Sequence, residues 1–309
     1  MNNKIIDVRD AFFDSVYEIA KNDKEVIFLA SDHTAFSLGK FQKDLPNQFI
    51  NVGISEQNMV SVAAGLAMNN KFVFIYGITP FVTMRCLEQI NINLCAMKSN
   101  VSIISIGSGL IYSSDGPTHH GTQELAIMSS LPNLSIYTAS DAFSSDQLPK
   151  IAYKNKGPSL LRIEKGSLEN LYLVKKEFSE DINLIIENEE ILILSTGITT
   201  QKAFEISNEL KKQNIKVGVV DILRFKPLNE EKIVKLIKNC KKIITIEENI
   251  PKGGIASAIS EIIVSYNLNC KLSKYSLKNE YLFESGPREW MHEKHGLSRD
   301  DIIKDICEI

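Results

Sequence analysis

Short runs of apolar residues recur along the chain, and segments with helical periodicity separate them. Three clear examples are Glu25–Ala30 (EVIFLA), Val101–Ile106 (VSIISI) and Glu190–Thr196 (EILILST). Runs of this length without polar alternation are typical of strands that are buried on both faces of a parallel sheet. Their alternation with helices predicts an α/β fold built on mostly parallel sheets.

The other expected elements continue this alternation. Further strands are expected at Phe49–Val52, Phe72–Tyr76, Leu134–Thr138, Ser159–Ile163, Val217–Asp221, Lys242–Glu247 and Lys271–Tyr275. Helices are expected at residues 8–22, 55–68, 82–97, 200–214, 229–239 and 254–266, from Gln123 onward, and in the C-terminal tail, where Ser298 is placed to cap a short helix.

The chain of 309 residues is long enough for two hydrophobic cores. Residues 168–188 are rich in charge and show no clear period, so they are interpreted as a linker. The linker would separate a first domain, residues 1–167, from a second domain, residues 189–309. Each domain is expected to be a mostly parallel sheet flanked by helices.

Charge and cysteine content exclude several classes of protein. The formal net charge is −3, so there is no basic excess to favour nucleic acid or an anionic membrane surface. The longest apolar run, 72–82, contains Gly77 and Pro80 and is too short to span a membrane. The N-terminus lacks the features of a signal peptide, and the five cysteines form no CxxC pair. These features predict a cytoplasmic protein with reduced thiols.

An acidic residue, Glu56, stands where a predicted strand turns into a helix. The strand Phe49–Val52 is broken by Gly53, and Ser55 is placed to cap the helix that follows. A carboxylate in the first turn of a helix is stabilised by the helix dipole and by free N–H groups. Taken alone, Glu56 is therefore an ordinary helix-start acid.

A second polar stretch, Ser113–Glu124 (SSDGPTHHGTQE), contains Asp115, His119 and His120. Its glycine and proline predict a turn-rich loop, which can hold side chains over a cleft. Adjacent histidines rarely reach one ion together, so no metal site is expected here. His119 is favoured as a functional residue, whereas His120 is expected to bond to the backbone.

Several motifs, taken in order, resemble the transketolase family and its relative deoxyxylulose-phosphate synthase. In the first domain they are GISEQNMVSVAAGLAM, TPFVTMRCLEQI, DGPTHHGTQELAIMSSLPNLSIYTASD and GPSLLRIEKG. In the second domain STGITTQKAFE, VVDILRFKPL, EENIPKGGIASAI and HGLSRDDI are similar to the family's C-terminal domain. The resemblance implies a thiamine-diphosphate enzyme made of a pyrimidine-binding domain and a C-terminal domain.

The resemblance also implies a partner subunit. Full-length transketolases hold Mg²⁺ and the diphosphate in an N-terminal domain with a Gly-Asp-Gly motif, and this sequence contains no such motif. The chain therefore resembles the C-terminal half of a split transketolase, with an active site shared between two polypeptides. An α2β2 heterotetramer is expected, with Mg²⁺ held by the partner and no metal held by this chain.

By the same resemblance, Glu56 matches the family's catalytic glutamate. Its carboxyl group would hydrogen-bond to a pyrimidine nitrogen and promote the tautomer whose amino group acts as the base. Phe81, with Ile78, would form the wall on which the pyrimidine stacks, although Phe81 is equally compatible with an ordinary core role. Asp32 more weakly matches an acid of the cofactor pocket.

Asp115 and His119 match the family's substrate-contacting pair, which would hydrogen-bond the hydroxyls of a donor ketose. The residues that usually bind the sugar phosphate differ here. Gly107 falls at the usual histidine and Lys165 at the usual arginine, with Arg162 or Arg85 as possible substitutes. Lysine holds phosphate only as a point charge. We therefore expect an aldose acceptor other than the usual pentose phosphate.

Two alternatives remain open from the sequence. The β-subunit of a 2-oxo acid dehydrogenase has the same architecture, although the DGPTH loop favours a transketolase. A non-catalytic scaffold is also compatible with the chain, although the presence of Glu56, Asp115 and His119 argues against it. A nicotinamide enzyme is disfavoured because no GxGxxG follows a strand. In the second domain, Glu247, Glu248, Gly253 and Gly254 are interpreted as turn and packing residues of an interface-building unit.

Overall fold

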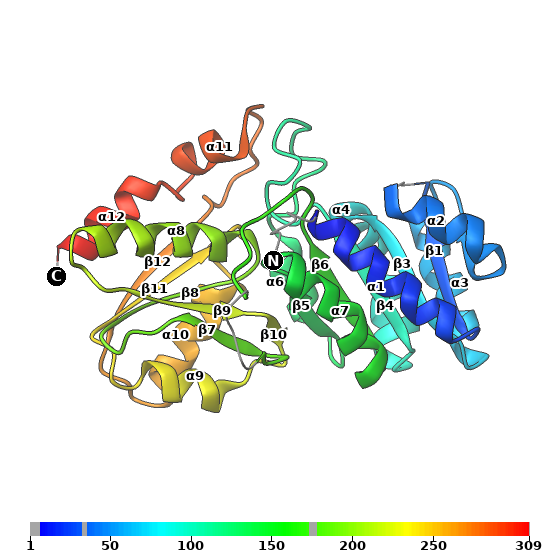
Figure 1. Ribbon diagram of the computed structural model, residues 1–309, viewed down its shortest axis with the longest axis horizontal. Helices are drawn as coiled ribbons and strands as arrows, with labels where there is room; N and C mark the ends of the chain where they lie inside the picture. Colours follow the sequence, from blue (N-terminus) through cyan, green and yellow to red (C-terminus); the bar gives the residue numbers. More distant parts are fainter. Residues whose placement is uncertain (1–6, 33–35, 173–177, 309) are drawn as a thin grey trace, which may run out of the picture.

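The computed structural model describes residues 7–32, 36–172 and 178–308. Two α/β domains lie side by side along the long axis of the molecule (Figure 1). Each domain has a mostly parallel sheet with helices on both faces, as the apolar runs predict. Within the described ranges, no helix has the length and apolar character needed to cross a membrane.

The first sheet has seven strands in the order β10-β5-β6-β4-β3-β1-β2, and only β10 is antiparallel to its neighbour. The strands are β1 (Val26–Ala30), β2 (Phe49–Asn51), β3 (Phe72–Ile78), β4 (Val101–Ile106), β5 (Ser135–Thr138), β6 (Ser159–Ile163) and β10 (Arg224–Lys226). Every residue of β1, β4 and β6 is buried, which explains their continuous apolar sequences.

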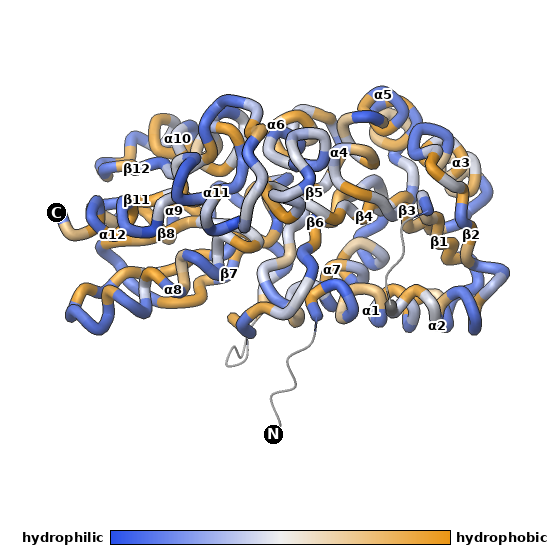
Figure 2. Tube along the Cα trace, turned by 90° about the horizontal axis from the view of Figure 1, so that it is seen from above, coloured by the Kyte–Doolittle hydropathy of each residue, from blue (hydrophilic) through white to orange (hydrophobic). Residues whose placement is uncertain are grey.

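Helices cover both faces of this sheet (Figure 2). Helices α1 (Val8–Asn22), α2 (Phe36–Asp44) and α7 (Ala142–Asn155) lie on one face. On the other face are α3 (Glu56–Met68), α4 (Thr79–Val82), α5 (Leu87–Gln89) and α6 (Glu124–Ser129). The sequence analysis missed α2 and α7. Helix α7 contains Pro149, a residue that ordinarily ends a helix.

The single helix predicted over residues 82–97 is wrong. This segment consists of α4, a 3₁₀ turn (Met84–Cys86), α5 and a π-helix (Ile90–Ala96). Thr83 interrupts the helix with φ −113° and ψ −80°, and its hydroxyl donates to the Thr79 carbonyl at 2.5 Å. A threonine that bonds back to its own preceding turn competes with the regular helical ladder. The interruption sets the position of Arg85, which lies in the 3₁₀ turn.

The second sheet has five strands in the order β12-β11-β8-β9-β7, and only β7 is antiparallel to its neighbour. The strands are β7 (Ile182–Ile186), β8 (Ile191–Ser195), β9 (Gly218–Ile222), β11 (Lys242–Glu247) and β12 (Lys271–Ser276). The helices are α8 (Ile198–Lys212), α9 (Glu230–Ile237), α10 (Ile255–Ser265), α11 (Arg288–Lys294) and α12 (Arg299–Cys307). Ser298 accepts a hydrogen bond from the Asp301 amide, so the predicted cap of α12 is confirmed.

The predicted linker, residues 168–188, is wrong for its last part because it contains β7. Ile182 is buried, and β7 pairs with β9 at the edge of the second sheet. Charged residues flank this strand, so the sequence pattern around it did not indicate a strand. The second domain therefore begins earlier than residue 189.

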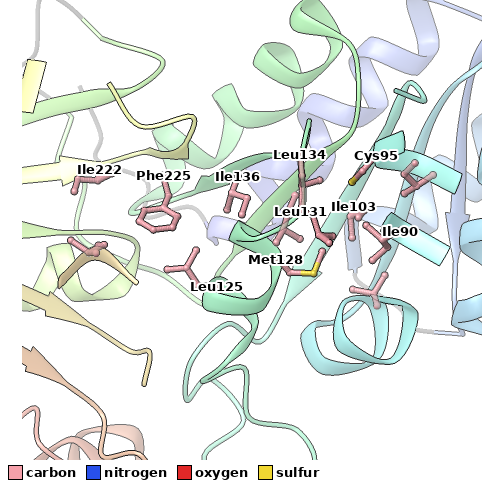
Figure 3. Packing of buried hydrophobic residues seen from close by; sticks show 14 of the residues in the cluster. Ile90, Cys95, Ile103, Leu125, Met128, Leu131, Leu134, Ile136, Ile222 and Phe225 are labelled. Atoms are coloured by element: carbon pink, nitrogen blue, oxygen red, sulfur yellow. The ribbon is translucent and has the colours of Figure 1, made fainter. Parts of the chain in front are cut away.

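The two domains share one hydrophobic core. Strand β10 leaves the second domain and pairs antiparallel with β5, so that Arg224 faces Tyr137. Figure 3 shows Phe225 and Ile222 in the same cluster as Leu125 and Ile136 of the first domain. This packing fixes the second domain against the edge strand β5 and helix α6 of the first domain.

Candidate active site

The residues singled out from the sequence lie where parallel strands of the first sheet end. Asp32 follows β1, Phe81 follows β3, and Lys165 follows β6. The loop with Asp115 and His119 follows β4. Carboxyl ends of parallel strands meet at one edge of a sheet, which is where α/β proteins bind ligands.

Glu56 is the first residue of α3, and only 5% of it is exposed. Its Oε2 accepts a hydrogen bond from Arg85 Nη1 at 2.9 Å. Ser55 lies at the N-cap of α3, as predicted, but its hydroxyl donates to the Val52 carbonyl at 2.8 Å and makes no capping bond to the helix. The Glu56 carboxyl group therefore faces the Arg85 side chain from a buried helix start.

Arg85 connects this carboxylate to two aromatic rings. Its guanidinium carbon lies 4.3 Å from the centre of the Phe81 ring. The His119 ring meets Phe81 edge-on, with 5.1 Å between ring centres. Glu56, Arg85, Phe81 and His119 thus form one continuous group, although 53–56, 79–86 and the histidine loop are separate in the sequence.

His119 is held by a turn of its own loop. Its amide donates to the Gly116 carbonyl at 3.0 Å, and its Nδ1 lies 3.0 Å from the Thr118 hydroxyl. Asp115 has an exposed side chain, 3.4 Å from the Ser114 hydroxyl, and is not part of the ring contacts. The structure therefore brings His119 to the Phe81 ring, which Arg85 links to Glu56, but leaves Asp115 at the surface of the loop.

His120, the next residue along the loop, is buried. Burial lowers the pKa of its imidazole, and the backbone of Ser113 partly offsets this effect. The backbone bonding of His120 stays a prediction, because its buried Nε2 has no hydrogen-bond partner among the described residues.

Tyr112 joins the group and was missed by the sequence analysis. Its ring centre lies 6.2 Å from that of His119 and 4.3 Å from the Lys165 ammonium nitrogen. Gly107 has φ +99°, and a Cβ at this position would lie 2.6 Å from the Tyr112 ring. The glycine is thus required for the tyrosine to pack here. This contact depends on tertiary packing, so the sequence offered no signal for it.

Two predicted cofactor residues lie at the margin of the group. Asp32 is exposed, has φ +53°, and exchanges two hydrogen bonds of 3.1 Å with the Asn51 side chain. Ile78 is the last residue of β3 and is half-buried. Neither Asp32 nor Ile78 is seen to contact Glu56, so their roles in binding the cofactor remain predictions.

Arg162 does not lie in a position to bind substrate, which corrects one expectation. It is 4% exposed, and its Nε donates to Glu124 Oε1 at 2.6 Å. Its Nη1 donates to the Thr138 hydroxyl at 2.9 Å, and Glu124 is fully buried. Every residue of β6 is buried, and here the guanidinium neutralises a core carboxylate.

A second cluster of charges lies between the domains. Of its members, the sequence analysis considered only Glu248, which it interpreted as a turn and packing residue. Arg288 donates to both Glu164 and Glu248, and His292 contacts Glu248. Burial alone would raise the pKa of Glu248, but the charges of Arg288 and His292 hold it well below its usual value. Next to it, burial raises the pKa of Glu247 to about 7.

In the described part of the chain, no three or more His, Cys, Asp or Glu side chains gather in a position to bind an ion. The five cysteines are free.

Comparison with known families agrees with this geometry. Residues 4–170 match the pyrimidine binding domain of transketolase, and residues 181–302 match the transketolase C-terminal domain. The chain belongs to the transketolase family. The family resemblance and the two-domain α/β fold expected from the sequence are thus confirmed.

Among the transketolase relatives are single subunits of about this length. The chain is 28% identical to a subunit of the apulose-4-phosphate transketolase of Phocaeicola vulgatus, across 100% of this chain and 99% of that protein. It is 28% identical to a putative transketolase C-terminal section of Methanocaldococcus jannaschii, across 97% and 95%. A solved structure described as a split gene transketolase, inactive β4 tetramer, superposes with a TM-score of 0.87 at 27% identity and covers 98% of each chain.

Proposed function

We propose that this transketolase-family chain is one subunit of a split transketolase. In this proposal it transfers a two-carbon ketol unit from a ketose donor to an aldose acceptor, with thiamine diphosphate as cofactor. The relatives named as a transketolase subunit and as a C-terminal section support a two-chain enzyme. A 2-oxo acid dehydrogenase subunit is the weaker alternative, because both domains match transketolase domains.

The observation that carries the proposal is the position of the Arg85 guanidinium. This flat group donates an N–H to buried Glu56 at 2.9 Å and lies 4.3 Å over the Phe81 ring. A guanidinium is planar and rich in nitrogen, and an aminopyrimidine shares this shape, although its ring nitrogen would accept a proton from the Glu56 carboxyl group where the guanidinium donates one. The acid and the ring therefore suit a flat nitrogen heterocycle between them. Arg85 is 43% exposed, so it can turn outward and vacate this position.

The residues of the group divide the chemistry between them. Thiamine diphosphate supplies the nucleophilic carbon that accepts the ketol unit. Glu56 would hold a proton at a pyrimidine nitrogen, and its burial would keep competing water away. Phe81 would stack on the heterocycle, with Ile78 beside it. His119 and Asp115 would hydrogen-bond the hydroxyls of the donor sugar, and His119 would also stabilise negative charge that develops on a sugar oxygen.

A partner subunit is proposed to hold Mg²⁺ and the diphosphate. Helix α3, which begins with Glu56, is apolar on most sides yet exposes Val62 and Met68, and Ile92 is exposed on the neighbouring π-helix. The Asn93 side chain bonds to Ser61 across these two elements at 3.3 Å. Exposed apolar residues on adjoining helices favour an interface beside the active site. We propose an α2β2 heterotetramer and, because all cysteines are free, a cytoplasmic location.

The acceptor is proposed to differ from the usual pentose phosphates. Tyr112 fills the space beside Gly107, and the Lys165 ammonium group lies over its ring. This arrangement offers one positive charge and an aromatic face instead of a guanidinium group that could donate two hydrogen bonds to a phosphate. The names of two relatives, an apulose-4-phosphate transketolase subunit and a 6-deoxy-6-sulfo-D-fructose transketolase subunit, describe unusual sugars. A fructose is a ketose and so a donor in this reaction, which means that these names support an unusual sugar substrate and not specifically an unusual acceptor. Arg85, once displaced from Glu56, is a second cation for the same substrate.

The test is the binding of thiamine diphosphate by this chain, alone and with an N-terminal-half transketolase subunit, in the presence of Mg²⁺. Binding that appears only in the mixture, and ketol transfer that disappears with Glu56→Ala, are expected. Absence of binding in every mixture would contradict a catalytic role and favour a scaffold. Tight binding of ribose 5-phosphate as acceptor would contradict the proposed acceptor class.

A further inference from the structure

The second domain holds the loop that contains Asp115 and His119. We call residues 110–122 the substrate loop. Its contacts with the second domain occur at both ends and in the middle, and Figure 1 shows the loop rising between the domains next to the chain that leads into α11. These contacts tie the donor-sugar residues to a domain that contributes no residue to the ring group.

Four hydrogen bonds make this connection. The Leu110 amide donates to Glu248 Oε2 at 3.0 Å, and the Ile250 amide donates to the Thr122 carbonyl at 2.9 Å. Between these ends, the Ser113 hydroxyl donates to the Gly286 carbonyl at 2.7 Å, and the Ser285 hydroxyl donates to the Ser114 carbonyl at 3.0 Å. Ser114 immediately precedes Asp115, so the middle contacts fix the backbone next to a substrate-contacting residue.

Arg288 anchors the segment that makes the middle contacts. It is the first residue of α11, two residues after Gly286. Its Nη1 and Nη2 donate to the two oxygens of Glu164 at 2.8 and 3.0 Å, and its Nε donates to Glu248 Oε1 at 2.6 Å. Both carboxylates are nearly fully buried. One side chain therefore joins the end of β6, the end of β11 and the segment that contacts the substrate loop.

The contacts leave little room for the loop to shift. Gly109, at the base of the loop, has φ +63°, and a Cβ there would lie 2.0 Å from Glu248 Oε2. On the other side, Glu164 is followed by Lys165, which lies over the Tyr112 ring, and Tyr112 contacts His119. Bidentate bonds from one guanidinium to two carboxylates fix geometry as well as charge. The substrate loop is thus fixed from both faces by groups that Arg288 joins.

We propose that Arg288, together with Ser285 and Gly286, positions the substrate loop, so that the C-terminal domain determines how tightly the active site holds its sugar. Arg288 is a positioning residue, because it acts through the loop and touches no reacting atom. The link to sugar binding depends on the proposed function, whereas the positioning of the loop does not.

The first experiment measures hydrogen–deuterium exchange in the full chain without cofactor or partner. The variant Ser113→Ala/Ser285→Ala removes both hydroxyl donors. The variant Arg288→Lys keeps the positive charge but lacks the guanidinium N–H groups that bind Glu164 and Glu248 together. The control is Ser145→Ala, whose hydroxyl donates to the Val8 carbonyl at the same 2.7 Å but lies between α1 and α7. Peptides covering 109–121 are expected to exchange roughly tenfold faster in both test variants and unchanged in the control.

Unchanged exchange in the serine variant, or an equal increase in Ser145→Ala, would overturn the proposal. The serine variant removes no buried charge, so it provides the test even if Arg288→Lys does not fold. This result is independent of any activity and so separates a failure of loop positioning from a failure of the proposed function.

The second experiment measures sugar and cofactor binding in the assembled enzyme. In the serine variant the KM for the donor ketose is expected to rise about tenfold, with the thiamine-diphosphate Kd within about twofold of wild type. A merely structural role would weaken both together. A KM unchanged from wild type, or an equal rise in KM and cofactor Kd, would contradict a specific role in holding the substrate loop.

Discussion

Replacing Arg85 with methionine tests whether this side chain occupies the place of the cofactor's pyrimidine. In the structure Arg85 Nη1 donates to Glu56 Oε2 at 2.9 Å, and the Arg85 guanidinium carbon lies 4.3 Å from the centre of the Phe81 ring. A heterocycle that takes this position has to displace the guanidinium. Removing Arg85 is therefore expected to strengthen cofactor binding, which is the opposite of what deleting a ligand-binding arginine does.

The size of the effect follows from the exposure of the pair. Arg85 is 43% exposed, so its ion pair with Glu56 is screened by solvent and contributes only a fraction of a kcal/mol. The contact with the Phe81 ring adds about 0.5–1 kcal/mol at an exposed site. Together these two contacts favour the arrangement in which Arg85 lies against Glu56 and Phe81 by about 1 kcal/mol. The affinity for thiamine diphosphate is therefore expected to rise about fivefold in Arg85→Met.

The assay is a titration of thiamine diphosphate against the chain mixed with its partner subunit and Mg²⁺. Arg299→Met is the matched control, because Arg299 is 37% exposed and paired to Glu209 on the second domain, far from the first sheet. A Kd for Arg85→Met that equals or exceeds wild type would refute displacement. If kcat/KM for the acceptor also falls tenfold or more, Arg85 additionally binds substrate, as the sequence suggested.

Three further outcomes follow from individual side chains. Glu56→Gln is expected to lower kcat by about 10²- to 10⁴-fold with an unchanged circular dichroism spectrum, and retention of more than a tenth of the activity would argue against proton holding by this residue. Arg162→Met leaves the buried Glu124 carboxylate unpaired and is expected to lower the free energy of unfolding in urea by about 3–5 kcal/mol. The double variant Arg162→Met/Glu124→Gln should recover most of this stability. A decrease of less than about 1 kcal/mol in Arg162→Met would contradict the buried pair. Burial raises the pKa of Glu247 to about 7, above its value near 4.5 in an unfolded chain, so its contribution to stability is complete below about pH 4.5 and is lost as the pH rises to about 7. Wild type is expected to lose about 2 kcal/mol more than Glu247→Gln between pH 5 and pH 8, and parallel pH profiles for the two proteins would disprove this assignment.

Much of the fold was predictable because buried strands have a local signature. Val8–Asn22 and Lys242–Glu247 were predicted with the bounds that the structure has, since continuous apolar runs and a clear 3.6-residue period depend only on nearby residues. The predictions failed where tertiary contacts override local pattern. The Thr83 hydroxyl breaks the helix expected over 82–97, and β7 forms within a charged segment because β9 offers it an edge.

The candidate site was predictable in part, because a resemblance transfers residues but not contacts. Glu56, Phe81 and His119 were named from separate motifs. In the structure Arg85 joins Glu56 to Phe81, and His119 contacts the Phe81 ring. Arg162 was assigned to the substrate, but its strand faces the core and pairs it with Glu124. The direction in which a strand side chain points depends on sheet register, which sequence motifs leave undetermined.

The sequence by itself determined the class of fold, the family and the residue types available for chemistry, because periodicity and motifs are properties of neighbouring residues. Tertiary structure alone decided that Tyr112 fills the space beside Gly107 and that Arg85 bridges an acid to a ring. It also decided that Arg288 joins two buried carboxylates from different domains next to the substrate loop. These contacts link residues up to 124 positions apart, and only the packing of two sheets through a shared core brings such residues within hydrogen-bonding distance.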